Sequence, residues 1–191
     1  MRTLLLALVA VTALAEERPS MRQLPADGGL EKPPSRRELV DARSQIKARF
    51  REPLSHTETA AGAMLASDML FQASLDENDR ALKWLLLEES RELGAAAGNA
   101  DAVTRAITVA SALYEFDALD TELKSLSAIP LRALDPVRAT RLAEAAETLA
   151  LKARTDGRGE LAQSATLLAI RAWQRTGNTE AARRAAKSPS R

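Results

Sequence analysis

The stretch "LLLEESRELGAAAGNADAVTRAI", Leu85 to Ile107, decides the fold. Up to Ala97 it consists mostly of strong helix formers. Gly98 can take the left-handed conformation that ends a helix, and Asn99 can cap the next helix through its side-chain oxygen. A partial echo, "RAWQRTGNTEAARRA", lies at residues 171–185. The two Gly-Asn pairs therefore predict turns between helices, and we assign them no role in binding.

Composition sets the class of fold. The chain has 191 residues, of which 46% are hydrophobic but only 3% aromatic. This length suits one domain with its own core. The core must then consist of Ala, Leu, Val and Ile. Because helix formers far outnumber strand formers, the composition favours an all-α fold.

The first residues have the features of a signal peptide. "MRTLLLALVAVTALA" carries one positive charge at Arg2, an apolar run from Leu4 to Leu14, and a small residue on either side of Leu14. This pattern predicts cleavage after Ala15 and a periplasmic or secreted protein with no stable membrane anchor. The alternative, an uncleaved anchor helix, is weaker because the apolar run falls short of the roughly 20 residues that cross a bilayer.

Charge and cysteine content narrow the classes of partner. The chain has no Cys, so it has no disulfide and no attachment point for a lipid. An oxidising compartment permits disulfides without requiring them, so this is compatible with export. Loss of Arg2 with the signal peptide leaves 26 basic residues (27 − 1) against 26 acidic ones. A net charge near zero argues against nucleic acid and anionic membranes as partners.

The segment after the expected cleavage site differs from the remainder. Residues 16–35, "EERPSMRQLPADGGLEKPPS", contain four of the eight prolines and no apolar period. Such a composition is typical of a disordered linker. We therefore expect a signal peptide over 1–15, a linker over 16–35, a helical domain over 36–187 and a disordered tail over 188–191.

Start and stop signals divide the helical domain. Ser35 with Glu38 makes a capping box, and Ser55 with Glu58 makes a second one. Further boundaries are indicated by Asp76 or Asn78, by Gly98 with Asn99, by Asp135 with Pro136, by Gly157, and by Gly177 with Asn178. These signals predict seven or eight helices. They leave open whether Ala118 to Ile129 joins the helical stack.

Apolar spacing indicates how the helices pack. The helix expected from Asp79 to Ala97 has two apolar faces. One face comprises Leu82, Leu86, Leu93 and Ala97, and the other comprises Trp84 and Leu87. A helix with two apolar faces lies between neighbours, so Trp84 is expected between helix layers. Short connections between such helices make antiparallel hairpins.

Small residues around one turn resemble those of a tetratricopeptide repeat. The residues that carry this resemblance are Leu149, Ala150, Gly157, Ala162 and Ala169. Around Gly98 the chain departs from the family, because Ser90 and Gly94 occupy positions where the family has Leu and Tyr. The turn glycines are 59 (157 − 98) and 20 (177 − 157) residues apart, which does not fit tandem repeats of about 34 residues. The resemblance implies stacked antiparallel hairpins, either an α-solenoid or a small bundle.

A second resemblance covers Leu65 to Lys187. Alanine-rich helix pairs, the Gly-Asn turn and the step Phe116-Asp117-Ala118 are similar to a helical region of exported planctomycete proteins of unassigned function. Since that family has no assigned catalytic residues, the resemblance implies a helical fold and no particular site.

Few residues are candidates for catalysis or metal binding. His56 is the only histidine and is expected in the first turn of a helix, without a visible acid or nucleophile partner. "DEND", Asp76 to Asp79, lacks the Gly and the distal Glu of a calcium-binding EF-hand loop. The glutamates Glu88, Glu89 and Glu92 are interleaved with Arg91, which predicts a solvated face of mixed charge.

The basic end of the chain has an ordinary explanation. Arg183, Arg184 and Lys187, joined by Arg191, offset the dipole of the last helix. The chain contains no phosphate-binding Gly-rich loop, zinc-ligand spacing or nucleophile elbow. We therefore predict no catalytic, cofactor-binding or metal-binding residue, no cofactor and no enzymatic activity.

Stacked helical hairpins present extended surfaces that bind peptides and other proteins. The sequence thus favours an exported, non-catalytic scaffold whose partner is a protein or peptide of unknown identity. The first alternative is a structural module that self-associates as a homo-oligomer. The second is a small-molecule-binding helical domain, disfavoured by the shortage of aromatic lining residues.

Overall fold

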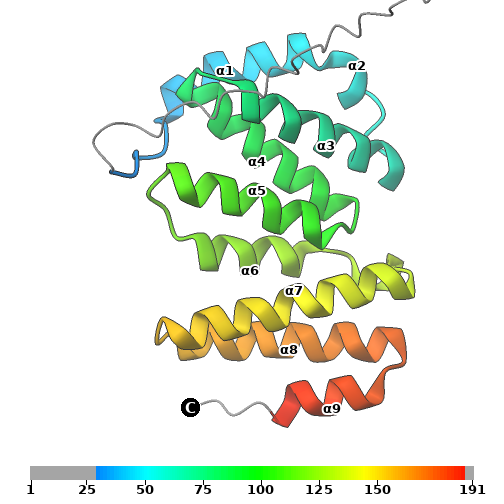
Figure 1. Ribbon diagram of the computed structural model, residues 1–191. Helices are drawn as coiled ribbons and strands as arrows, with labels where there is room; N and C mark the ends of the chain where they lie inside the picture. Colours follow the sequence, from blue (N-terminus) through cyan, green and yellow to red (C-terminus); the bar gives the residue numbers. More distant parts are fainter. Residues whose placement is uncertain (1–28, 188–191) are drawn as a thin grey trace, which may run out of the picture.

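The computed structural model describes residues 29–187, and every regular element within them is helical (Figure 1). The helices are α1 (Arg36–Arg49), α2 (Arg51–Leu54), α3 (Ala60–Asp76), α4 (Arg80–Ala96), α5 (Ala100–Leu113), α6 (Ala118–Ala128), the 3₁₀ helix η1 (Leu131–Ala133), α7 (Pro136–Thr155), α8 (Gly159–Thr176) and α9 (Thr179–Lys187). The all-α prediction is confirmed. Nine α-helices in this range exceed the expected seven or eight because the short α2 carries no start signal of its own.

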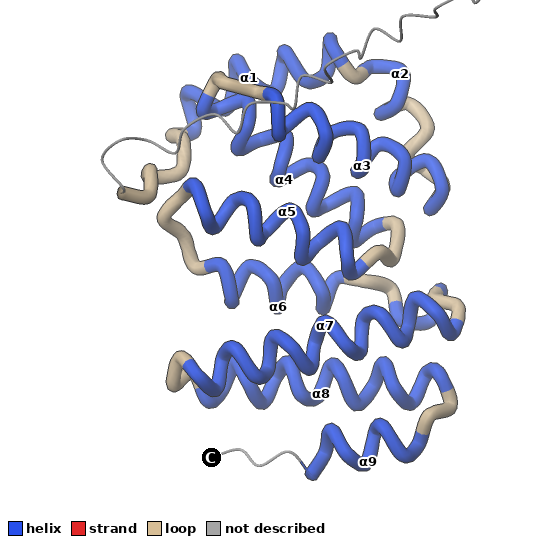
Figure 2. Tube along the Cα trace, viewed as in Figure 1, coloured by secondary structure: helices blue, strands red, loops and turns tan. Residues whose placement is uncertain are grey.

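The helices form a stack in which successive members lie one below another (Figure 1). From α3 to α6, each helix packs against the next helix and also against the next but one. The connections between them are short loops (Figure 2). The helix α6 contacts α4, α5, α7 and α8, so residues 118–128 belong to the stack, the point that the sequence left open. None of the helices among residues 29–187 is both long and apolar enough to cross a membrane.

The Gly-Asn pairs make turns, as predicted. Gly98 has a φ of +72°, and the N–H of Asn99 donates to the carbonyl of Gly94 at 2.8 Å. The side chain of Asn99 accepts from the N–H of Ala102 at 3.1 Å and so caps α5. The same arrangement recurs at Gly177, with φ +78°, and Asn178, which caps α9. The other predicted boundary residues behave likewise: Asp135 caps α7 ahead of Pro136, and Gly157 has φ +72°.

The largest apolar cluster lies among α5, α6, α7 and α8, and two smaller clusters lie on the two faces of α4. Leu82 and Leu86 pack with residues of α1 and α3, whereas Trp84 and Leu87 pack with residues of α5. The indole of Trp84 meets the ring of Tyr114 edge to face, with centroids 4.9 Å apart. Trp84 therefore lies between helix layers, as the two apolar faces predicted.

Small and polar residues let α3, α4 and α5 approach closely. The buried hydroxyls of Ser67 and Ser90 each donate to the other residue's carbonyl, at 2.7 and 2.8 Å. A Cβ at Gly94 would lie only 2.8 Å from the Cβ of Ala102. Ser90 and Gly94 are the positions at which the chain departs from the tetratricopeptide pattern, and here they are contact points between helices.

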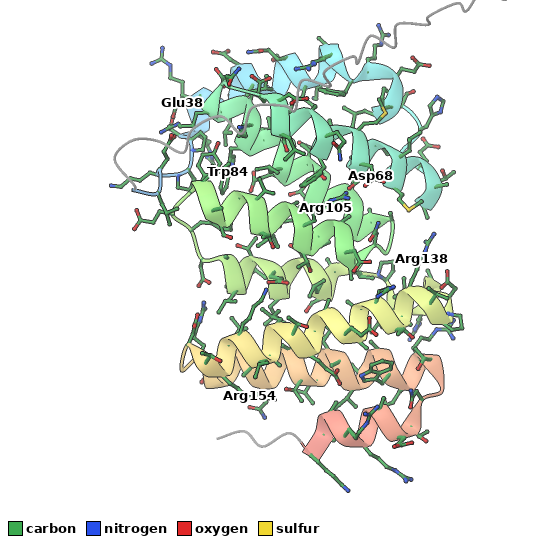
Figure 3. The ribbon with its side chains drawn as sticks, viewed as in Figure 1. Glu38, Asp68, Trp84, Arg105, Arg138 and Arg154 are labelled. Atoms are coloured by element: carbon green, nitrogen blue, oxygen red, sulfur yellow. The ribbon has the colours of Figure 1, made fainter. Side chains whose placement is uncertain are left out.

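Polar side chains tie the layers together. Arg105 on α5 reaches Asp68 on α3 at 2.5 Å and lies over the ring of Phe71, with its Cζ 4.2 Å from the ring centroid (Figure 3). Arg138 on α7 donates to the carbonyl of Ala97 at 3.0 Å. These contacts join helices that are not consecutive in the chain.

One predicted helix start is wrong. Ser55 does not open a helix with Glu58: it follows α2, and its hydroxyl donates to the carbonyl of Glu52 at 2.7 Å. Helix α3 begins at Ala60, where Thr59 accepts from the N–H of Gly62 at 3.1 Å. The hydroxyl of Ser55 bonds backward to α2, so it does not cap the helix that follows.

The predicted cap of α4 is also corrected. Asp79, rather than Asp76 or Asn78, accepts from the N–H of Leu82 at 2.8 Å. Asp76 is the last residue of α3. The side chain of Glu77 accepts from the backbone N–H groups of the two residues that follow it. The "DEND" motif is thus a helix end, a turn and a cap.

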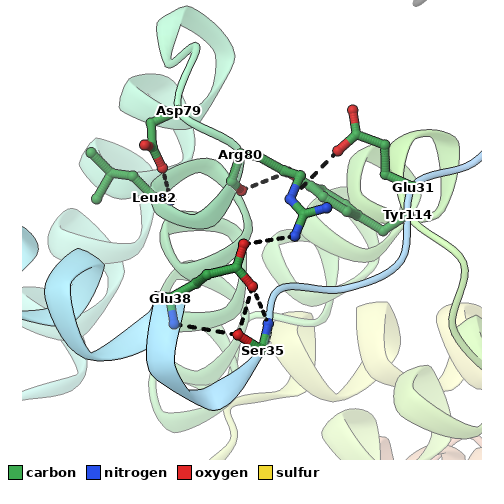
Figure 4. A network of polar contacts seen from close by, with 7 residues as sticks. All are labelled: Glu31, Ser35, Glu38, Asp79, Arg80, Leu82 and Tyr114. Carbon is green, nitrogen blue, oxygen red and sulfur yellow. Dashed lines mark hydrogen bonds and ion pairs between the residues drawn. The ribbon is translucent and has the colours of Figure 1, made fainter.

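The last part of the expected linker packs against the domain. Glu31 pairs with the end of α5, donating to the carbonyl of Leu113 at 2.9 Å and accepting from Glu115 at 2.7 Å. Arg80 binds Glu38 of the capping box at 3.0 Å and approaches Glu31 at 3.7 Å (Figure 4). For residues 29–35 the prediction of disorder is therefore wrong. The signal peptide, the remaining linker and the tail at 188–191 lie outside the described residues.

Candidate functional site

The residues considered for catalysis or metal binding do not lie together in the structure. His56 is exposed in the turn between α2 and α3, not in the first turn of a helix as expected. Over residues 29–187, no three His, Cys, Asp or Glu side chains are placed to hold a metal ion together.

The glutamates of α4 are less solvated than predicted. Arg91 contacts Glu88 at 3.7 Å and Glu92 at 3.3 Å, and it donates to Ser125 at 2.7 Å. Burial raises the pKa of Glu88 and of Glu89. The interleaved charges therefore form a partly buried network that connects α4 to α6.

A pocket of about 180 Å³ lies between α4 and α6, with α5 as its floor. Trp84 and Phe116 line it, and Pro33 of the N-terminal segment stands at its edge. Two of the six aromatic residues thus line this pocket, which removes part of the objection to a small-molecule site. Glu88 and Arg91 also line the pocket, but each already has a partner of opposite charge.

A larger groove, about 340 Å³, lies among α7, α8 and α9. Its apolar lining consists of alanines, the exposed Leu151 and the half-buried Trp173, and its polar lining comes from all three helices. The lining residues are Glu147, Ala150, Leu151 and Arg154 of α7, Thr166, Ala169 and Trp173 of α8, and Arg184 and Ala185 of α9. Because three of them are buried alanines, the floor is recessed and the longer side chains stand around it.

Two hydrogen bonds between α7 and α8 fix the side chains of this groove. The indole N–H of Trp173 donates to Glu147 at 2.9 Å. The guanidinium of Arg154 donates through Nη2 to the hydroxyl of Thr166, also at 2.9 Å. Figure 3 labels Arg154 on the C-terminal half of α7, close to α8. Both the aromatic ring and the cation are therefore positioned before any ligand binds.

The charges of the groove are not balanced. Among residues 29–187, no carboxylate lies within ion-pair distance of Arg154 or Arg184. The Nε of Arg154 is buried and has no hydrogen-bond acceptor in this part of the chain. Arg158 near the same turn differs, because it binds both carboxylate oxygens of Asp117, at 2.5 and 2.8 Å, and lowers the pKa of Asp117.

The sequence did not reveal this groove. From the sequence, we interpreted Arg184 only as part of the basic end of the last helix, and we predicted no role for Arg154. The residues come from three helices and are brought together only when α7 and α9 pack on the same helix α8. A local signal existed in Trp173, an aromatic residue in a chain that has few of them.

The comparisons with known proteins identify no relative. No family model, no curated protein and no solved structure matches the chain. Function is therefore inferred from the residues of the chain itself.

Proposed function

We propose that the chain is an exported, non-catalytic helical scaffold that mediates protein–protein interaction in the cell envelope. The observation that supports this most directly is the open groove of α7, α8 and α9. It combines a fixed aromatic side chain, Trp173, with the exposed Leu151 and an unpaired guanidinium at Arg154. Aromatic and arginine side chains are the residues that most often contribute strongly to protein–protein binding. The partner is a protein or a peptide.

The size of the groove favours a short segment of the partner. A volume of about 340 Å³ lies at the lower end of the range for ligand sites. It holds a few side chains and leaves the remainder of a partner outside. Stacked helices offer continuous surface on either side of the groove for further contacts.

A matched pair of substitutions tests this proposal. Leu151 and Val137 are both exposed aliphatic residues of α7, but only Leu151 lines the groove. We expect Leu151→Glu to abolish capture of a defined partner from envelope extract and Val137→Glu to leave it intact. Equal capture by the two variants would place the binding surface elsewhere.

Self-association is the alternative that a specific observation favours. Helix α3 exposes Leu65 (61%) and Met69 (41%), one turn apart, on the side away from the core. An apolar helix surface without a partner is a common contact between copies of a chain. Light scattering over a concentration series tests it: a monomer at all concentrations contradicts self-association, whereas a dimer abolished by Leu65→Glu supports it.

Export is a separate part of the proposal, and it depends on residues 1–15. The sequence resemblance of residues 65–187 to exported planctomycete proteins implies the same localisation. N-terminal sequencing of the protein from its producing cells tests it. A chain that begins at Glu16 supports export, and a retained Met1 contradicts cleavage.

A further inference from the structure

We propose that the groove of α7, α8 and α9 binds a carboxylate-bearing segment of a partner protein, with Arg154 and Arg184 as the groups that contact the carboxylate. This inference rests on the proposed function and specifies the chemistry of the partner. It follows from unpaired charge, from an unfilled hydrogen bond and from the shape of the groove.

The hydrogen-bonding state of Arg154 provides the first reason. A guanidinium carries five N–H donors in a fixed planar fork that matches the two oxygens of a carboxylate. Thr166 accepts from one nitrogen, Nη2, while Nε is buried without an acceptor. A buried N–H without an acceptor is costly. Nη1, which is neither buried nor hydrogen-bonded within residues 29–187, is the donor that a carboxylate oxygen placed in the groove can reach.

The position of Arg184 provides the second reason. It lies on α9, on the other wall of the same groove, and has no carboxylate partner among residues 29–187. Two guanidiniums that line one cavity attract an anion more strongly than either does alone. The contrast with Arg158 is informative, because that side chain already holds Asp117.

The helix dipoles do not account for this arrangement. Arg154 and Arg184 lie in the last turns of α7 and α9, where positive charge is favourable. Lys152 and Lys187 occupy the same turns and provide that charge. The dipole does not explain why Arg154 is held across the groove by Thr166, with its Nε facing no acceptor.

The remaining lining distinguishes a peptide carboxylate from a polyanion. Glu147 precedes Arg154 by seven residues, a distance of about 10 Å along a helix. A nucleic acid or polyphosphate that filled the groove would therefore meet a negative charge at Glu147. The alanine floor and Leu151 suit an aliphatic side chain. The groove thus fits an acidic residue next to an apolar one.

A selection from a displayed library of random seven-residue peptides tests the proposal on the full chain. We expect the parent to enrich peptides in which Asp or Glu stands next to an aliphatic residue. We expect Arg154→Gln and Arg184→Gln each to weaken a selected peptide at least tenfold in fluorescence anisotropy. Arg171→Gln is the matched control: Arg171 is an exposed arginine of α8, two residues from each of the groove residues Ala169 and Trp173, and does not line the groove.

The outcomes separate the inference from the proposed function. Selected peptides without acidic residues, whose binding is lost in Leu151→Glu but not in the arginine variants, overturn the carboxylate assignment and leave the peptide-binding groove standing. Selected peptides that bind Leu151→Glu as tightly as the parent contradict both. Inorganic phosphate that displaces the peptide at lower concentration than glutarate also overturns the carboxylate assignment. Circular dichroism of each variant excludes unfolding, and Arg184 is exposed enough to be replaced without loss of the fold.

Discussion

At Gly98 the backbone has a φ of +72°, and a Cβ there would lie 2.5 Å from Cδ2 of the buried Leu134. Gly157 has the same φ, but apart from its own chain neighbours no atom lies within 4 Å of the position that its Cβ would take. The two glycines therefore share a conformational requirement and differ in their surroundings. At the scale of single residues, the fold depends on such local conditions.

This difference gives a prediction with an internal control. We expect Gly157→Ala to lower the free energy of unfolding by about 1 kcal/mol, the cost of a left-handed alanine. Gly98→Ala should cost more, because Leu134 must also move. Urea denaturation of both variants measures the difference. Equal losses would show that Leu134 adjusts without cost.

Trp84 gives a larger effect. It is 8% exposed and contacts Tyr114 and Phe116 through perpendicular rings. We expect Trp84→Ala to lower the free energy of unfolding by about 3–5 kcal/mol, as truncation of a buried aromatic side chain does. Thermal and urea denaturation measure it. A melting temperature equal to that of the parent is incompatible with a buried indole.

The pH dependence of stability involves Tyr114. Burial raises its pKa to about 12, from an ordinary value near 10. A raised pKa means that the folded state holds the phenol proton more tightly than the unfolded state. This contribution to stability is therefore complete below pH ~10 and is lost as the pH rises toward about 12. We expect urea denaturation from pH 9 to 11 to show a steeper decline for the parent than for Tyr114→Phe, which is less stable at pH 9 because it lacks the 2.9 Å bond to the Arg80 carbonyl.

At the scale of helices, a boundary depends on which side chain forms a hydrogen bond with the free backbone N–H groups of the helix start. Ser55 and Thr59 both precede α3, and both have hydroxyls. Ser55 donates to a carbonyl of the preceding helix, whereas Thr59 accepts from the N–H of Gly62. Only the second interaction satisfies a free N–H of the helix start.

Two substitutions distinguish these roles. We expect Thr59→Ala to lower the free energy of unfolding by about 1 kcal/mol, the usual cost of a lost N-cap. Ser55→Ala should cost clearly less, because its exposed bond is replaced by water. Denaturation of both variants under the same conditions tests this order. The reverse order would restore Ser55 as the helix start.

At the scale of the whole molecule, packing is between near neighbours in the chain. Most contacts join consecutive helices or the next but one, as in repeat proteins, whose stability depends on the interfaces between neighbours. At the C-terminal end, α9 buries only Ala181, Ala182 and Ala185. These small side chains remove little apolar surface from water, so apolar burial stabilises the last helix only weakly.

Hydrogen exchange tests this gradient. We expect the amides of α9 to exchange at least tenfold faster than the central amides of α7 and α8, since the latter form the most extensive helix pair. Mass spectrometry of short peptides measures both regions in one experiment. Equal protection throughout would show that the stack opens only as a unit.

Local signals in the sequence determined the helical class, the Gly-Asn turns, the Asp135 cap and the burial of Trp84. Helix propensity, left-handed glycine and apolar period act within a few residues, so the sequence displays them directly. The packing of residues 29–35 and the groove around Arg154 were decided by tertiary structure, whereas the start of α3 depends on two local hydroxyls, of which only Thr59 caps the helix. For residues 29–35 and for the groove, the outcome depends on groups that are distant in the chain: Glu31 pairs with the end of α5, and Arg154 and Arg184 line one groove only because α7 and α9 both pack on α8.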